Sequence, residues 1–251
     1  MDLGIRGRVA LVTGASAGIG AACALALAAE GVRVAVAARR AELLAAVVDA
    51  AGARGAPEAA AFPVDLADET SIAAMLRAVD DRFGGVDILI ANGGGPRPGT
   101  YRDVRLADWD TAYRTTLRAM LQLVDGVLPS MSERGWGRIV ALTSTSVKQP
   151  IGNIVLSNAF RTGLVSALKT LSSDVAARGI TVNAIATGRI RTDRLRAVYP
   201  NEDAMREGVP AGRVGTPEEL AAVATFLCGD GAAFVTGQTI AVDGGMTRSL
   251  L

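Results

Sequence analysis

Glycines gather at one place where they could hold a phosphate. Gly14, Gly18 and Gly20 lie in the run TGASAGIG at residues 13–20, directly after an apolar stretch. Glycine lets the backbone turn tightly and approach a pyrophosphate, and the helix that follows offers free N–H groups and a positive dipole. Such glycines in a strand-to-helix turn predict a dinucleotide site rather than a purely structural turn. The expected contacts are Gly14, Ser16, Ala17, Gly18, Ile19 and Gly20.

The end of the second apolar stretch indicates which dinucleotide is used. It ends in Ala38, Arg39 and Arg40. Dehydrogenases that use NAD usually have an acidic residue here, which accepts a hydrogen bond from the ribose 2′-hydroxyl. A guanidinium can instead pair bidentately with a 2′-phosphate. We therefore predict NADP(H) in preference to NAD(H). The alternative is that both arginines are solvated charges at the start of a helix.

The composition excludes several other kinds of site. The chain has no histidine and two cysteines, so a His-based catalytic triad and a zinc site of the usual Cys/His kind are excluded. We expect no metal. The net charge of +1 does not suggest a nucleic-acid partner. Cys23 and Cys228 lie in helical patterns and are expected to be small buried apolar residues rather than a disulfide or a reactive thiol.

The same sequence carries no sign of a membrane or export segment. No apolar run approaches the ~18 residues of a membrane span. The first twelve residues lead into a strand pattern and lack the features of a signal peptide. Two cysteines that are not expected to pair suit a reducing compartment. We therefore expect a cytoplasmic protein with no membrane partner.

Short β-branched runs alternate with longer helical patterns. The expected strands cover residues 8–13, 33–38, 60–65, 87–91, 138–144, 181–185 and 239–242. The expected helices cover residues 19–30, 40–51, 69–83, 106–131 with a possible break near Asp110, 157–178 and 217–227. This alternation predicts an α/β fold: one Rossmann domain over residues 1–251, with a doubly wound parallel sheet of about seven strands and helices on both faces. The irregular stretch at about 189–213 is expected to be a substrate lid.

Several motifs, in a fixed order, resemble those of the short-chain dehydrogenase/reductase family. Residues 13–20 resemble its TGxxxGxG motif, and Asp65 resembles its adenine-contacting aspartate. Residues 92–95 stand where the family has NNAG, and residues 187–192 resemble the segment that holds the nicotinamide. Residues 212–219, 235–238 and 242–245 resemble the C-terminal signature, in a layout like that of 3-oxoacyl-carrier-protein reductases. The resemblance implies further cofactor contacts from Asp65, Leu66, Asn92, Gly93, Gly94, Arg161, Gly188, Ile190 and Thr192.

The family's catalytic residues are only partly present. The resemblance implies a serine that polarises the substrate oxygen, a tyrosine that moves the proton and a lysine four residues after it. Ser144 matches that serine, but Ser157 and Arg161 stand at the tyrosine and lysine positions, and Thr116 stands at the position of a helical asparagine. Serine is a much weaker acid than tyrosine, so we expect Ser157 to hydrogen-bond a substrate oxygen or a water rather than to donate its proton. Arginine keeps its proton, so we expect Arg161 to hold the nicotinamide ribose and supply positive charge. Lys148 or a bound water is the candidate proton donor, and the alternative for Lys148 is a solvated surface lysine.

These features predict an NADP(H)-dependent oxidoreductase that acts on a carbonyl or hydroxyl group of a small or acyl substrate, without the usual tyrosine and lysine. The alternatives are a non-redox enzyme on the same scaffold (a lyase, isomerase or cyclase) and a catalytically weak NADP(H)-binding protein. The resemblance also implies a homo-oligomer, either a tetramer or a dimer. The expected lid contains five arginines that attract an acidic substrate, attract the phosphate of an acyl carrier or CoA, or are simply solvated: Arg189, Arg191, Arg194, Arg196 and Arg206.

Overall fold

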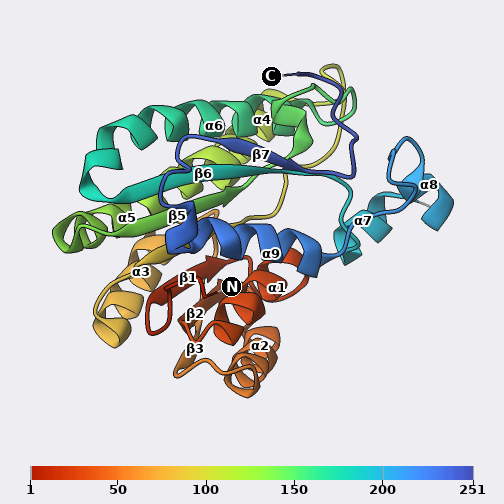
Figure 1. Ribbon diagram of the computed structural model, residues 1–251. Helices are drawn as coiled ribbons and strands as arrows, with labels where there is room; N and C mark the ends of the chain where they lie inside the picture. Colours follow the sequence, from red (N-terminus) through yellow and green to blue (C-terminus); the bar gives the residue numbers. More distant parts are fainter. Residues whose placement is uncertain (1, 200, 251) are drawn as a thin grey trace.

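A parallel sheet of seven strands forms the centre of the computed structural model, which describes residues 2–199 and 201–250 (Figure 1). The strands stand in the order β3-β2-β1-β4-β5-β6-β7. Their bounds are β1 Val9–Thr13, β2 Arg33–Ala38, β3 Ala59–Pro63, β4 Ile88–Ala91, β5 Gly137–Leu142, β6 Ile180–Thr187 and β7 Thr239–Val242. All seven predicted strands are confirmed. The order changes direction between β1 and β4, and this is the switch point at which doubly wound sheets bind ligands.

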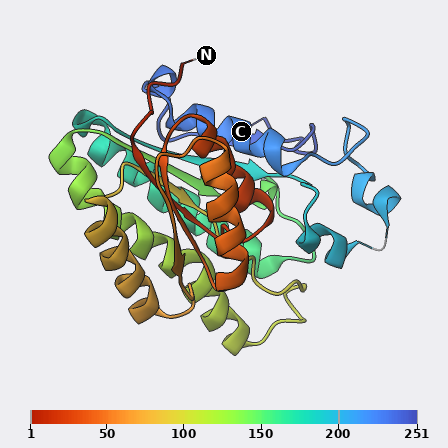
Figure 2. The same cartoon turned by 90° about the horizontal axis from the view of Figure 1, so that it is seen from below.

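Helices cover both faces of this sheet (Figures 1 and 2). The bounds are α1 Gly18–Ala29, α2 Ala41–Ala53, α3 Glu69–Phe83, α4 Leu106–Ala112, α5 Ala119–Arg134, α6 Val155–Val175, α7 Asp193–Val198, α8 Glu202–Arg206 and α9 Pro217–Cys228. One core layer contains apolar residues of α1, α2 and α9, and the other contains those of α3, α5 and α6. No helix in the described part of the chain is long and apolar enough to cross a membrane.

The two cysteines lie in the first of these layers. Cys23 and Cys228 are fully buried free thiols on α1 and α9, which pack against each other. Burial raises the pKa of Cys23 to about 12 and also raises the pKa of Cys228. Both thiols are therefore protonated and unreactive at neutral pH, which confirms their predicted role as small apolar residues.

The helix expected over residues 106–131 is divided into three parts. A π-helical segment, Tyr113–Arg118, separates α4 from α5, so the interruption lies just after the expected position at Asp110. Thr116 lies in this segment, is 4% exposed, and its Oγ1 has no hydrogen-bond partner among the described residues. Short π-helical segments occur frequently at functional sites. The irregular geometry thus falls on a position that the sequence had singled out.

The expected lid is more regular than predicted. Two short helices, α7 and α8, lie within residues 189–213 and stand out from the body of the molecule (Figures 1 and 2). Thr192 caps α7 by accepting from the backbone N–H of Leu195, and Asn201 caps α8 by accepting from that of Ala204. Helices of six and five residues are too short to show a hydrophobic period, which explains why the sequence reading missed them.

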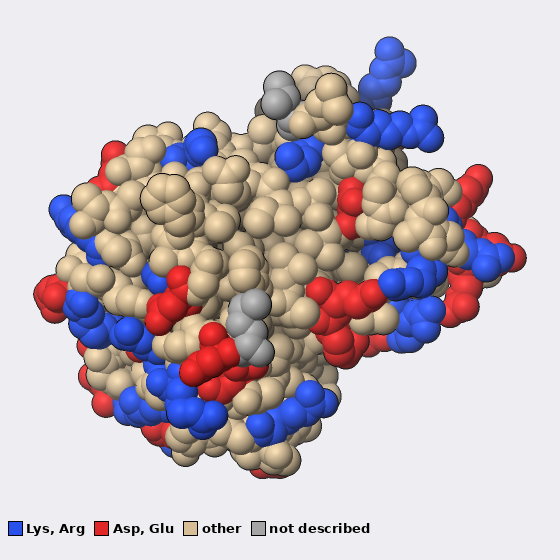
Figure 3. Space-filling model, viewed as in Figure 1, with Lys and Arg blue, Asp and Glu red and all other residues tan. Residues whose placement is uncertain are grey.

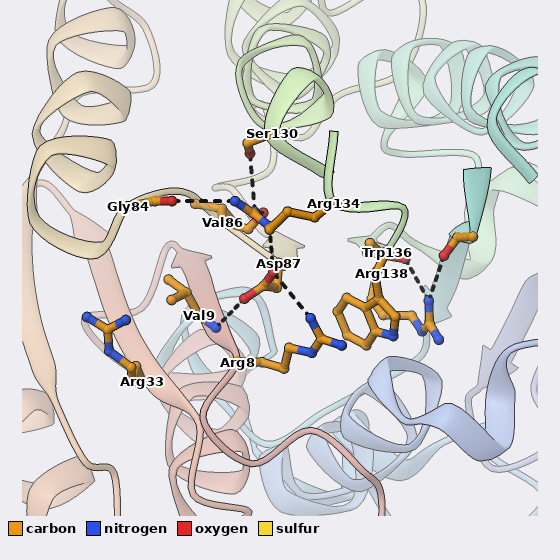
Figure 4. Close-up of polar contacts among 12 residues, drawn as sticks. Arg8, Val9, Arg33, Gly84, Val86, Asp87, Ser130, Arg134, Trp136 and Arg138 are labelled. Atoms are coloured by element: carbon orange, nitrogen blue, oxygen red, sulfur yellow. Dashed lines mark hydrogen bonds and ion pairs between the residues drawn. The ribbon is translucent and has the colours of Figure 1, made fainter. Parts of the chain in front are cut away.

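A network of charged groups joins the amino ends of the central strands (Figure 4). Asp87 precedes β4, and its Oδ2 accepts from the N–H of Val9 at 2.8 Å. Its Oδ1 lies 3.1 Å from Arg134 Nε and 3.7 Å from Arg8 Nη1. The guanidinium of Arg8 also lies over the ring of Trp136, 4.0 Å from its centroid. These contacts fix the edge of the sheet that lies opposite the candidate site.

Candidate active site

The predicted site residues gather at the carboxyl edge of the sheet. Each group of them follows the end of a different parallel strand, and the carboxyl ends of parallel strands share one edge. Each of these strands, from β1 to β6, is followed within two residues by a predicted site residue, and in strand order these are Gly14, Arg39, Asp65, Asn92, Ser144 and Gly188. Topology alone therefore brings six separate stretches of sequence together.

The glycine-rich turn has a geometry that only glycine satisfies. Gly14 and Gly18 adopt positive φ angles of 59° and 57°. A Cβ atom on Gly20 would lie 2.3 Å from the carbonyl oxygen of Gly14, so no side chain fits at that position. Ala17 is extended and no side chain caps α1, so the first N–H groups of the helix have no side-chain acceptor. Ile19 packs against the apolar core and fixes the start of the helix.

Two hydrogen bonds fasten the turn to the neighbouring strand. Thr13 Oγ1 donates to the carbonyl of Asn92 at 2.7 Å and accepts from its N–H at 2.9 Å. The side-chain amide of Asn92 donates to the carbonyl of Gly14 at 3.3 Å. A Cβ on Gly93 would lie 3.1 Å from Met120 Cε, whereas Gly94 has open space around it. Asn92 therefore joins the loops after β1 and β4 by hydrogen bonds. Of the two glycines that follow it, Gly94 has more space around it than Gly93.

The end of β2 lies beside this turn. Arg40 Nη2 donates to Ser16 Oγ at 3.1 Å, so the turn and the second strand meet through a basic side chain. Arg39 is exposed, and Ala38 is the last residue of the strand. Asp65 Oδ1 accepts from the N–H of Ala67 at 3.0 Å, which holds the loop after β3. Half-buried Leu66, next to it, packs against the second core layer.

The segment after β6 lies against the same turn. A Cβ on Gly18 would be 3.1 Å from Thr192 Cγ2, so the start of α7 lies next to the glycine-rich turn. Ile190 is buried and forms a parallel bridge with Gly215. A Cβ on Gly188 would be 2.5 Å from the Cα of Asp243, so a larger residue would displace the segment.

The candidate catalytic residues lie after β5 and on α6. Ser144 is half-buried, and its Oγ accepts from the N–H of Ser146 at 3.1 Å, which leaves its own O–H free to donate. Ser157 is 7% exposed in the first turn of α6, and its hydroxyl makes no hydrogen bond with a described residue. Arg161 lies one turn later on the same face of the helix. Its Nη1 donates to the carbonyl of Leu142 at 2.8 Å.

The electrostatic state of the site depends on Arg161. Burial, and secondarily the nearby guanidinium of Arg194, lower the pKa of Arg161 from its ordinary value to about 10. The side chain is thus positively charged at neutral pH and is held in an environment that disfavours its charge. Lys148 is half-buried next to the short 3-10 turn that follows Ser144, and its Nζ makes no hydrogen bond or ion pair with the described residues.

Two further residues shape the site: Asn158, which was not predicted, and Arg194, which the sequence did not distinguish from the other arginines of the expected lid. The side chain of Asn158 donates to the carbonyl of Ile151 at 2.9 Å and accepts from its N–H at 3.4 Å, which fixes the loop before α6. Arg194 donates to the carbonyls of Gly95 and Pro96, both at 3.2 Å. Its partners lie 99 and 98 positions away, so no local pattern indicates the contact.

Comparisons with known proteins agree with this geometry over the whole chain. A family model described as "Enoyl-(Acyl carrier protein) reductase" matches residues 14–247. The chain is 38% identical to the 3-oxoacyl-(acyl-carrier-protein) reductase FabG of Escherichia coli, over 97% of this chain and 99% of that protein. The chain belongs to the short-chain dehydrogenase/reductase family. This dehydrogenase/reductase is also 36% identical to the D-threitol dehydrogenase of Mycolicibacterium smegmatis, over 98% and 95% of the two chains.

A solved structure confirms the fold of this dehydrogenase/reductase. The L-sorbose reductase of Gluconobacter frateurii, crystallised with NADPH and L-sorbose, superposes with a TM-score of 0.94 at 30% identity and covers 100% of both chains. The prediction of a single Rossmann domain of this family is thereby confirmed. The chain is an oxidoreductase of a family that binds a nicotinamide cofactor.

Proposed function

We propose that the chain is an NADP(H)-dependent oxidoreductase that interconverts a carbonyl and a hydroxyl group on a small or acyl substrate. The observation that carries this proposal is the intact cradle around Gly20. A Cβ on Gly20 would lie 2.3 Å from the carbonyl oxygen of Gly14, so only glycine fits there. Hydrogen bonds between Thr13 and Asn92 hold the turn against β4. A tight glycine turn between a strand and a helix with uncapped N–H groups is the arrangement that holds a pyrophosphate in dinucleotide-binding domains.

The residues at the carboxyl edge fit each part of a dinucleotide. The turn from Gly14 to Gly20 and the start of α1 suit the pyrophosphate. Asp65 and Leu66 suit the adenine, and Asn92, Gly93 and Gly94 line the path between the two halves. Arg161, Gly188, Ile190 and Thr192 suit the nicotinamide end.

The preference for NADP(H) rests on the groups beside the end of β2. Arg40 and Ser16 are 3.1 Å apart, and Arg39 is exposed next to them. Two guanidinium groups and a hydroxyl form a donor set that suits a 2′-phosphate. The L-sorbose reductase of similar fold was crystallised with NADPH, so this scaffold can hold that cofactor.

The catalytic groups of this chain work mainly by stabilising charge. When bound, the cofactor supplies or accepts a hydride at its nicotinamide ring. Ser144 and Ser157 can donate hydrogen bonds to the substrate oxygen, and the positive charge of Arg161 stabilises negative charge that develops on that oxygen. Neither serine is acidic enough to donate its proton outright at neutral pH. The proton is therefore assigned to Lys148 or to a water molecule.

The direct test follows NADPH consumption with a panel of ketones, imines and acyl thioesters. We expect turnover with at least one carbonyl compound and loss of it in Ser144→Ala. In Lys148→Met, turnover should fall by about tenfold or more if the lysine donates the proton, because general acids contribute ~10²–10⁴-fold. Tight NADPH binding without consumption on any substrate would contradict the proposal and favour a binding protein or a non-redox enzyme. A cytoplasmic homo-oligomer stays a prediction from the sequence.

A further inference from the structure

Four of the five lid arginines are occupied by partners within the lid. Arg191, Arg196 and Arg206 form ion pairs with Glu202, Asp193 and Asp203. Arg189 donates to the carbonyls of Ala204, Met205 and Glu207, and its guanidinium lies 4.7 Å from the centroid of the Tyr199 ring. Positive and negative side chains lie side by side on the α7–α8 arm in Figure 3. These four side chains therefore stabilise the lid and do not supply a free cation.

Arg194 differs from the other four. It lies on α7, but its two donors reach out of the lid to the carbonyls of Gly95 and Pro96, in the loop that follows β4. A Cβ on Gly95 would be 2.6 Å from Arg194 Nη2, so this glycine makes room for the guanidinium. The lid is thus joined to the active-site edge of the sheet through a positive side chain.

The side chain of Arg161, on α6, also reaches the carboxyl edge of the sheet. It donates to the carbonyl of Leu142, the last residue of β5, while Arg194 covers the loop after β4. These strands are neighbours, and Ala91 pairs with Ala141 at their carboxyl ends. No ion pair between either arginine and an aspartate or glutamate occurs among residues 2–199 and 201–250. The two guanidinium groups are near enough for the charge of Arg194 to act on Arg161, and neither has a carboxylate partner among the described residues.

We propose that Arg194, together with Arg161, recognises a carboxylate on the substrate, so that the chain acts on carbonyl compounds that carry a carboxylate close to the carbonyl group. The reduction of such a compound rests on the proposed function, whereas the binding of its carboxylate does not. A carboxylate offers two acceptor oxygens, which suit the fork of a guanidinium and relieve the repulsion between the two cations. Arg161 then faces both the substrate anion and the reacting oxygen.

The test compares acids with their uncharged methyl esters. Pyruvate, 2-oxobutanoate and benzoylformate, each beside its methyl ester, are titrated by calorimetry into the NADP⁺-saturated protein. We expect at least one acid to bind tenfold or more tightly than its ester, which corresponds to ~1.4 kcal/mol or more. Arg194→Gln should abolish this preference by weakening the acid alone, and Arg194→Lys should restore part of it. Arg196→Gln is the matched control, since Arg196 pairs within α7 with Asp193.

The outcomes separate this inference from the proposed function. Equal binding of acid and ester in every pair, no binding of any acid, or an unchanged preference in Arg194→Gln would overturn the inference, even if all the carbonyl groups are reduced. A preference that depends on Arg194, without NADPH consumption, would support the inference and overturn the proposed reaction. NADPH affinity and melting temperature show whether Arg194→Gln is folded, and both should match Arg196→Gln.

Discussion

Thr13 and Asn92 exchange two hydrogen bonds across the carboxyl ends of β1 and β4, with the threonine hydroxyl donating at 2.7 Å and accepting at 2.9 Å. Thr13 is fully buried, so no water can replace the hydroxyl. Thr13→Val keeps the shape of the side chain but leaves the N–H and carbonyl of Asn92 unpaired. We expect a loss of about 1–3 kcal/mol in the free energy of unfolding and weaker NADPH binding. Chemical denaturation and a nucleotide titration measure the two effects, and an unchanged stability would contradict this role.

Gly20→Ala should abolish nucleotide binding, because its Cβ would meet the carbonyl oxygen of Gly14 at 2.3 Å. The backbone must move apart to accept the methyl group, which alters the turn expected to hold the pyrophosphate. The matched control is Gly52→Ala on α2, where a Cβ meets nothing within 4 Å. That substitution should raise stability by about 0.5–1 kcal/mol through helix propensity and leave NADPH affinity unchanged. Retained affinity in Gly20→Ala would contradict the requirement for this close contact in nucleotide binding.

Arg161→Met should lower turnover strongly and raise stability. The pKa of Arg161 falls to about 10 because burial and Arg194 disfavour its charge, so removal of the charge relieves a cost in the folded state. We expect a melting temperature higher by about 2–4 °C for each kcal/mol gained. Differential scanning calorimetry measures this change, and a melting temperature lowered by several degrees would contradict it.

The difference in stability between the wild-type protein and Arg161→Met should change with pH in one direction. As the pH rises through about 10, Arg161 loses its proton in the folded chain, whereas the unfolded chain keeps the proton to higher pH. The wild-type protein therefore gains stability from this group as the pH rises through about 10, and its deficit relative to Arg161→Met shrinks. Urea denaturation of both proteins at pH 8 and near pH 10.5 is the measurement. A deficit that grows with pH would show that the charge is stabilised in the folded state.

Asp87→Asn should destabilise the fold without acting on the site. The carboxylate lies 2.8 Å from the N–H of Val9 and 3.1 Å from Arg134 Nε, at the opposite edge of the sheet. Loss of its charge leaves Arg8 and Arg134 facing a neutral group, and we expect a cost of about 1–3 kcal/mol. Denaturant titration measures it, with exposed Asp80→Asn on α3 as the control. Equal stability of the two variants would show that the network contributes little.

Local pattern was sufficient to predict the sheet and the tight glycine turn at the end of β1. Most strands of this chain are short apolar runs rich in valine and isoleucine that are followed by a glycine, an arginine or a polar residue, and a parallel sheet brings these ends together at one edge. Gly14, Gly18 and Gly20 therefore fell into one turn as predicted. The contact between Arg40 and Ser16 agrees with the same reasoning.

The substrate end could be predicted only in part, because its contacts join residues far apart in the chain. Arg194 reaches carbonyls 98 and 99 positions away, and nothing in its neighbours distinguishes it from the four lid arginines that pair locally. The helices α7 and α8 are too short for a periodic signal and depend on their caps at Thr192 and Asn201. The three-dimensional fold is needed to show that Arg194 contacts the loop after β4.

The most direct test of the account is a fluorescence titration of the purified protein with NADPH and NADH in parallel, repeated with Arg40→Asp. We predict that the wild-type protein binds NADPH at least tenfold more tightly than NADH, since a charge-assisted pair with a phosphate contributes ~1.5–3 kcal/mol. Arg40→Asp should reduce or reverse that preference, because its carboxylate repels the 2′-phosphate. Equal affinity for the two nucleotides, or no binding of either, would contradict the account.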